Sequence, residues 1–205
     1  MKPNEIIEKI LRITNPILSK NIDESNNFPV GFTFYHVLER VNFNLESIRV
    51  LVEDGITKHE HAIGLLSRNL LSDFITTGYI IRLSKSDDEF YMRLYSLYDS
   101  DLKKAKSFLN LYLDAGFIDN EEVEKYNEKF NDENNVFKKI RDYCLEFDIK
   151  KRFPPTNEII EEFFKSGLND LWAEQIKRSY DTWAFLSKYE HLGWHSYDFT
   201  RTVDS

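Results

Sequence analysis

A hydroxyl and an imidazole occur near the C-terminal end at a spacing that suits chemistry. Ser187 and His191 are four residues apart, so on a helix they share a face, and they continue a stripe that begins with Ile176, Tyr180 and Trp183. An imidazole can take the proton of a serine hydroxyl and so make it a nucleophile. Such a pair needs a third group that orients the histidine, and the sequence identifies none.

Two interpretations of this pair stay open. In the structural one, which we prefer, His191 donates to a carbonyl and Ser187 bonds back to its own helix, so that both polar groups are satisfied without activity. In the functional one, His191 and Ser187 line a pocket with polar groups of a central helix. The candidate pocket residues on that helix are Arg68, Asn69, Ser72 and Asp73.

Arg68 lies inside an otherwise apolar segment, where an unpaired guanidinium is costly. Asp73 is five residues further along, which is a poor distance for a pair within one helix. We therefore expect the partner of Arg68 to come from another helix. A structural clamp is favoured over a phosphate-binding role, since buried pairs also occur without function.

The histidines suggest a metal site, but their spacing does not support one. His59 and His61 lie two residues apart and would point to different helix faces, and Gly193 separates His191 from His195. No glycine-rich phosphate loop, Cys-x-x-Cys, His-Glu-x-x-His or Gly-x-Ser-x-Gly motif occurs. We expect no metal and no cofactor, and the missing motifs argue against the common enzyme classes.

Charge and composition limit the location and the partners. The formal net charge is −8, which makes nucleic-acid binding unfavourable. Residues 87–148 carry 16 acidic and 9 basic side chains, whereas 150–201 carry eight of each, so a polyanion would meet less repulsion there. One cysteine, Cys144, and the lack of a secretory signal predict a cytoplasmic protein. The partner, a protein or a small ligand, stays open, as does a homodimer.

The elements that position these residues are all predicted to be helices. Apolar residues recur at spacings of three and four, and the expected helices cover about 5–19, 34–52, 58–83, 87–115, 120–147, 156–167 and 171–192. The 58–83 segment is apolar on most faces, so it should be the buried central helix. Arg68, Asn69 and Asp73 interrupt its apolar stretch, which argues against a membrane span.

Local signals mark where these helices begin and end. Thr57, Ser86 and Asp119 each stand three residues before a glutamate, as in a capping box, and Asn169 is a further predicted N-cap. The glycines at 55, 116, 167 and 193 follow apolar-periodic runs and predict helix ends. We expect one all-α domain over 1–205, with an N-terminal helix and polar loop (1–30), a bundle of about seven helices (31–195) and a tail (196–205).

Two tryptophans of the last predicted helix are expected in the core. Trp172 and Trp183 are eleven residues apart, about three helical turns, so both rings should face the same way. Because Ile176 and Tyr180 share that face, we expect both tryptophans to be largely buried.

The C-terminal third combines a proline-bearing turn, a short helix and a helix that closes on a Leu-Ser-x-Tyr-x-His segment. Its residues are Phe153-Pro154-Pro155, Glu158-Ile159-Ile160, Tyr180 and Leu186-Ser187-Lys188-Tyr189-Glu190-His191. In this order they resemble a widespread bacterial family of helical proteins of unknown function. The central-helix pattern of that family is similar to Ala62, Leu65, Leu66, Arg68, Leu70 and Leu71, so the resemblance covers about residues 35–195.

Related helical bundles include the HEPN-like domains, which are nucleotide-binding or ribonuclease domains, many of them in phage-defence and toxin systems. Their ribonucleases use an arginine followed four to six residues later by a histidine. Here Arg68-Asn69 resembles the start of that motif, but positions 73 and 74 are Asp and Phe. This departure argues against ribonuclease activity.

Two functional hypotheses follow. The leading one is a non-catalytic helical module that binds a protein or a small ligand, in a bacterial stress or phage-defence locus by analogy with the resemblance. The alternative is a nucleic-acid or nucleotide-processing enzyme of HEPN-like type whose site combines His191, Ser187 and Arg68.

Overall fold

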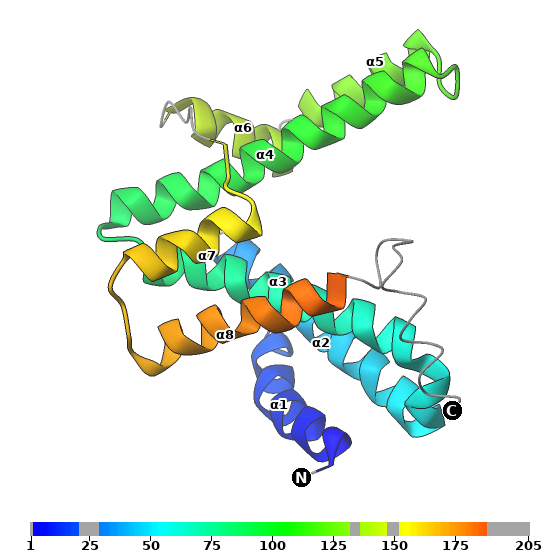
Figure 1. The fold of residues 1–205 in the computed structure, drawn as a ribbon. Helices are drawn as coiled ribbons and strands as arrows, with labels where there is room; N and C mark the ends of the chain where they lie inside the picture. The colour runs from blue at the N-terminus through cyan, green and yellow to red at the C-terminus, as the bar shows by residue number, and fades with distance from the viewer. Residues whose placement is uncertain (1, 21–28, 132–135, 147–151, 188–205) are drawn as a thin grey trace. The chain divides into compact units, whose positions relative to one another are not determined.

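A computed structural model of the protein describes residues 2–20, 29–131, 136–146 and 152–187. Within these ranges every regular element is helical: eight α-helices and one 3-10 turn, with no strand (Figure 1). The predicted all-α fold class is confirmed. The helices are α1 (Pro3–Leu18), α2 (Val30–Gly55), η1 (Thr57–His59), α3 (Glu60–Arg82), α4 (Asp87–Asp114), α5 (Asn120–Asn131), α6 (Val136–Glu146), α7 (Thr156–Lys165) and α8 (Leu171–Leu186).

The predicted helix over 120–147 is wrong in one respect, because two helices, α5 and α6, occupy that range. The residues between them, 132–135, lie outside the described residues. The predicted continuation of the last helix to Leu192 lies outside the described residues, as do His191, Gly193 and His195.

The chain divides into two compact units. The first unit comprises the described parts of Met1–Leu83 and Thr156–Ser205, and the second unit is Ser84–Pro155. Each has its own packed interior. The expectation of one domain over 1–205 stays a prediction.

In the first unit α3 is the central helix. It packs against α2, α7 and α8, and α1 packs against α2 (Figure 1). Ile75 of α3, Phe163 of α7 and Ile176 of α8 are completely buried, which confirms the predicted buried central helix. The contact of α3 with α8 depends on Gly78, because a Cβ at that position would overlap Cδ1 of Ile176.

In the second unit α4 packs against α5 and α6. Leu94 and Tyr95 of α4 are buried, and the ring of Tyr95 stacks on Tyr143 of α6 with centroids 5.7 Å apart. Cys144 donates its thiol to the carbonyl of Tyr95 at 3.4 Å. Burial raises the pKa of Cys144 to about 11, so this thiol stays protonated and serves packing rather than reactivity.

The predicted helix boundaries are partly confirmed. Asp119 and Glu122 form the reciprocal capping box, with Glu122 N donating to Asp119 Oδ1 at 2.8 Å and Asp119 N donating to Glu122 Oε2 at 3.2 Å. Ser86 Oγ accepts from Glu89 N, also as predicted. Thr57 makes no side-chain cap and begins the 3-10 turn, so that prediction is wrong.

Three further boundaries lie at the connections between helices. The N-cap of α8 is Asp170, one residue after the predicted Asn169. Gly116 and Gly167 follow their helices with φ of +72° and +71°, a backbone conformation that favours glycine, so the helix ends predicted there are confirmed.

Candidate functional site

Arg68 and Ser187 meet where α8 ends on α3. The Arg68 Nε donates to Ser187 Oγ at 3.1 Å, and the same hydroxyl donates to the carbonyl of Trp183 at 3.1 Å. The partner of Arg68 therefore comes from another helix, as predicted. A serine nucleophile would donate its proton to a base, whereas this hydroxyl donates to a backbone carbonyl of its own helix.

Trp183 is the centre of this cluster. Its indole Nε1 donates to Ser72 Oγ at 2.8 Å, and the guanidinium carbon of Arg68 lies 4.5 Å from the centroid of its ring. Tyr180 stacks on the same ring with centroids 5.7 Å apart. The sequence predicted Trp183 only as a core residue. In the structure its half-buried ring contacts Ser72 through its edge and Arg68 through its face, and its backbone carbonyl accepts from Ser187.

The remaining described candidates are placed differently. Asp73 is buried and binds the guanidinium of Arg40 on α2, whose Nε donates to Asp73 Oδ2 at 2.8 Å while Nη2 contacts Oδ1. Burial raises the pKa of Asp73 although the hydrogen bond from Arg40 opposes that rise. Asn69 is exposed. The structure thus brings Arg68, Ser72 and Ser187 together, whereas Asp73 pairs with Arg40 of α2.

The predicted partner of Ser187, His191, lies outside the described residues. In the part of the chain that the structure describes, no group of three or more His, Cys, Asp or Glu side chains is arranged to hold a metal ion. Within the same part, no helix is long and apolar enough to cross a membrane. Among the described contacts, the cluster around Trp183 is a clamp that fixes α8 on α3.

A groove of about 320 Å³ lies further along the same pair of helices. The residues that line it are Phe74, Thr77, Gly78, Ile81, Arg82, Trp172 and Ile176. Its walls are mainly apolar, and Thr77 and Arg82 are its polar members. A groove of this size is at the lower end of the range of small-molecule sites, which are concave, mostly apolar and carry few polar groups.

The expectation that Trp172 is buried is wrong, because 60% of this residue is exposed. The ring contacts Phe74, with centroids 6.2 Å apart, and forms a wall of the groove. Trp172 does lie on the same side of α8 as Trp183. However, its position around the helix does not fix what faces the ring: Trp172 contacts Phe74 of α3 and lines the open groove, whereas Gly78 packs closely against Ile176.

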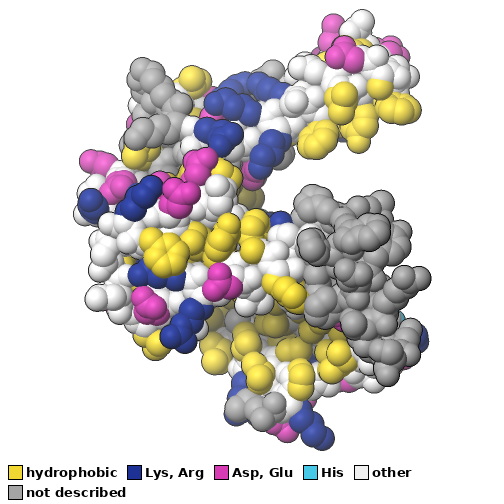
Figure 2. Space-filling model, in the orientation of Figure 1, with side chains coloured by type: hydrophobic (Ala, Val, Ile, Leu, Met, Phe, Trp, Pro, Cys, Tyr) yellow, Lys and Arg dark blue, Asp and Glu magenta, His cyan; other side chains and the backbone are white. Residues whose placement is uncertain are grey.

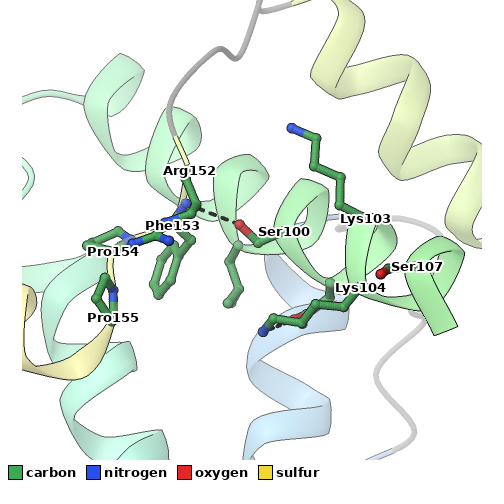
Figure 3. A pocket seen from close by; sticks show the side chains of 10 residues that line it. Ser100, Lys103, Lys104, Ser107, Arg152, Phe153, Pro154 and Pro155 are labelled. Atoms are coloured by element: carbon green, nitrogen blue, oxygen red, sulfur yellow. Dashed lines mark hydrogen bonds and ion pairs between the residues drawn. The ribbon is translucent and has the colours of Figure 1, made fainter. Parts of the chain in front are cut away.

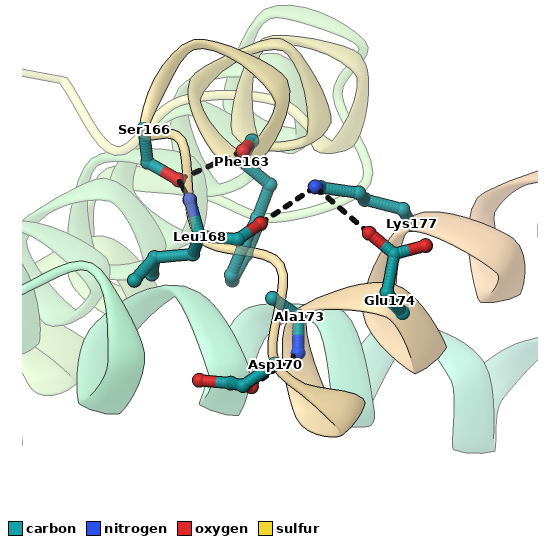
Figure 4. A network of polar contacts seen from close by, with 7 residues as sticks. All are labelled: Phe163, Ser166, Leu168, Asp170, Ala173, Glu174 and Lys177. Atoms are coloured by element: carbon teal, nitrogen blue, oxygen red, sulfur yellow. Dashed lines mark hydrogen bonds and ion pairs between the residues drawn. The ribbon is translucent and has the colours of Figure 1, made fainter.

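A polar network holds the start of α8, and hence Trp172, in place (Figure 4). Lys177 Nζ donates to the carbonyl of Leu168 at 2.7 Å, and Leu168 N donates to Ser166 Oγ at 3.2 Å. Asp170 caps α8 by accepting from Ala173 N at 3.0 Å, and this hydrogen bond is the main cause that lowers the Asp170 pKa. The connection from α7 to α8 is therefore tied to both helices.

The rim of the groove carries one paired charge. Arg82 forms an ion pair with Asp170, and both side chains are about 40% exposed. The guanidinium is thus already neutralised by a carboxylate that stays ionised at neutral pH. A ligand at this rim would gain more binding free energy from a neutral hydrogen-bond acceptor than from an anionic group, because Asp170 already supplies a negative charge.

Comparison of the chain with models of protein families, with curated proteins and with solved structures finds no match. The class of the protein is accordingly defined by its fold, an all-α helical bundle. Its function has to be inferred from the residues and the geometry described above.

Proposed function

We propose that this protein is a non-catalytic helical module that binds a small, mostly apolar ligand in the α3–α8 groove. The observation that carries the proposal is the exposed ring of Trp172, which lines the groove together with Phe74 and Ile81. An exposed aromatic wall over an apolar groove costs free energy unless something covers it. The network at the start of α8 holds that wall in place before any ligand binds, which reduces the entropy lost on binding.

The groove also indicates which ligand fits. About 320 Å³ accommodates one or two rings or a short acyl chain, since a cavity of roughly 150 Å³ already holds benzene. Thr77 and the neutralised Arg82 suit one uncharged acceptor on the ligand, such as a carbonyl or an ether oxygen. We therefore propose an uncharged ligand with an apolar body and a single polar group.

The geometry of the clamp supports a non-catalytic role. Arg68 is engaged by the ring of Trp183 and by Ser187, and the Ser187 proton is directed to a carbonyl. The HEPN-like alternative with His191, Ser187 and Arg68 would require these contacts to break. Membership in the bacterial helical family and a stress or phage-defence role stay proposals that depend on the resemblance over about residues 35–195. A cytoplasmic location stays a proposal that depends on the single cysteine, Cys144.

The test uses N-phenyl-1-naphthylamine, an uncharged fluorescent probe with an apolar body. Wild-type protein should bind it saturably, with quenching of tryptophan emission by energy transfer to the probe. Trp172→Ala should weaken binding at least about tenfold, a change of roughly 1.4 kcal/mol. The matched control is Leu171→Ala, which removes a neighbouring side chain that is 74% exposed and does not line the groove.

Circular dichroism and thermal melts would establish that both variants are folded. Binding that stays within about twofold of wild type in Leu171→Ala supports the groove. Absence of saturable binding to wild type, or an equal loss in both variants, would refute the proposal.

A further inference from the structure

A second cavity lies within the second unit, on one face of α4. Its volume is about 460 Å³, and one side is formed by α4 residues at spacings of three and four, the other by residues 152–155 (Figure 3). The lining residues are Leu97, Ser100, Asp101, Lys103, Lys104, Ser107, Arg152, Phe153, Pro154 and Pro155. The volume is within the range of small-molecule sites.

The charge of this cavity is opposite to that of its surroundings. Lys103, Lys104 and Arg152 line it together with one acid, Asp101, whereas residues 87–148 carry 16 acidic and 9 basic side chains. Figure 2 shows Lys and Arg side chains gathered where α4 and α6 lie in this view. A local concentration of cations on an acidic protein indicates an anionic ligand.

The existing ion pair of Lys104 at the cavity is weak enough to be exchanged. Lys104 pairs with Asp101 at 3.3 Å, and the side chains are 72% and 57% exposed. Lys103 pairs with Asp99 outside the cavity, with the lysine 68% exposed. The pair of Lys104 with Asp101 is exposed on both sides, and such pairs contribute little to stability, so a doubly charged phosphate can compete with Asp101 for the Lys104 ammonium group.

The wall opposite α4 is fixed and mostly apolar. Phe153 N donates to Ser100 Oγ at 3.1 Å, which anchors the segment to α4. Pro154 and Pro155 restrict their own backbone φ angles, so the ring of Phe153 and the two prolines form a preorganised surface. Because Ser100 accepts in this hydrogen bond, its hydroxyl proton can be donated to a phosphate oxygen.

We propose that this cavity binds a small organic phosphate, with the phosphate at the Lys104 ammonium group and a flat apolar body against Phe153 and the prolines. Lys103 extends from α4 in the opposite direction and adds positive charge at longer range (Figure 3). The Lys104 ammonium group supplies charge-assisted hydrogen bonds, which are the strong ones. The apolar wall selects an organic phosphate over the inorganic ion. The site shares no residue with the α3–α8 groove, so either proposal can fail without the other.

The experiment is titration calorimetry with phenyl phosphate and, in parallel, inorganic phosphate. Wild-type protein should bind phenyl phosphate with a Kd below about 1 mM and inorganic phosphate about tenfold more weakly. Lys104→Gln should weaken phenyl phosphate binding at least about fivefold. The matched control is Lys106→Gln, which makes the same charge change at an exposed position of α4 that does not line the cavity, and it should stay within about twofold of wild type.

A second variant tests the apolar wall. Phe153→Leu should weaken phenyl phosphate binding while leaving inorganic phosphate binding within about twofold of wild type. Circular dichroism would establish folding, and Lys104→Met replaces Lys104→Gln if the latter does not fold. Equal losses in Lys104→Gln and Lys106→Gln, equal affinity for the two phosphates, or no binding of phenyl phosphate would overturn the proposal.

Discussion

Gly78 allows α3 and α8 to approach closely. A double-mutant cycle with Ile176 measures the free energy that couples the two positions. In Gly78→Ala the new Cβ would overlap Cδ1 of Ile176 and lie 3.2 Å from its Cγ1 and 3.7 Å from Cζ of Phe163. Ile176 and Phe163 are completely buried, so neither side chain can move into solvent. Overpacking of this kind costs about 1–3 kcal/mol, and the better helix propensity of alanine offsets about 1 kcal/mol.

Ile176→Val removes the overlapping atom and should reverse the effect of Gly78→Ala. The valine change alone costs about 0.5–1.5 kcal/mol through the lost methyl group. With Cδ1 absent, alanine at position 78 keeps its helix propensity and loses most of the steric cost. The double variant should therefore be more stable than the sum of the single changes predicts, by about 1–2 kcal/mol.

The assay is urea unfolding followed by tryptophan fluorescence. All three tryptophans, at 172, 183 and 194, belong to the chain segments of the first unit and none to residues 84–155, so the signal reports the unit that contains Gly78. The slope of the transition should be the same in all four proteins. Additivity of the two changes within about 0.5 kcal/mol would show that Gly78 and Ile176 are not in contact.

Three further predictions concern buried polar groups. Because burial raises the Asp73 pKa, the carboxyl binds its proton more tightly in the folded than in the unfolded chain, so its stabilising contribution is present below about pH 4 and is lost as pH rises through the folded pKa. Asp73→Asn should lack this loss, and its urea midpoint should rise relative to wild type as pH increases above about 4. Cys144, with its pKa raised to about 11, should react with Ellman's reagent at pH 8 at least about 100-fold more slowly in the native protein than in urea, and comparable rates would contradict its burial. Trp183→Phe keeps a ring but loses the hydrogen bond to Ser72, so it should lower the free energy of unfolding by about 1–2 kcal/mol, and an unchanged midpoint would refute the clamp.

Features set by neighbouring residues could be predicted from the sequence. The capping box of Asp119 and Glu122 and the helix ends at Gly116 and Gly167 involve atoms within a few positions of one another. The all-α fold class follows from the same local patterns. Even here a choice between adjacent candidates was wrong, because Asn169 and Asp170 can both cap a helix and only the path of the connection selects Asp170.

Features set by residues far apart could not be predicted in the same way. Periodicity gives the direction of a side chain around its helix but not what faces it. Trp172 and Trp183 lie on the same side of α8. However, the part of α3 near Trp172 carries Gly78, whereas Ser72 of α3 accepts a hydrogen bond from Trp183. A polar partner for Arg68 on another helix was predicted from the cost of a buried charge, whereas its stacking on Trp183 needed the structure.

The clamp on Trp183 also has a consequence for the timing of synthesis. Ser72 and Trp183 are separated by 111 positions in the chain, and translation adds roughly 5–20 residues per second. The face of α3 that receives α8 therefore waits about 6–22 s on the ribosome before its partner is made. The second unit is one continuous stretch, Ser84–Pro155, and is completely synthesised within that interval. During the same interval the face of α3 at Gly78 lacks Ile176, which covers it in the folded protein, and so stays open to other contacts.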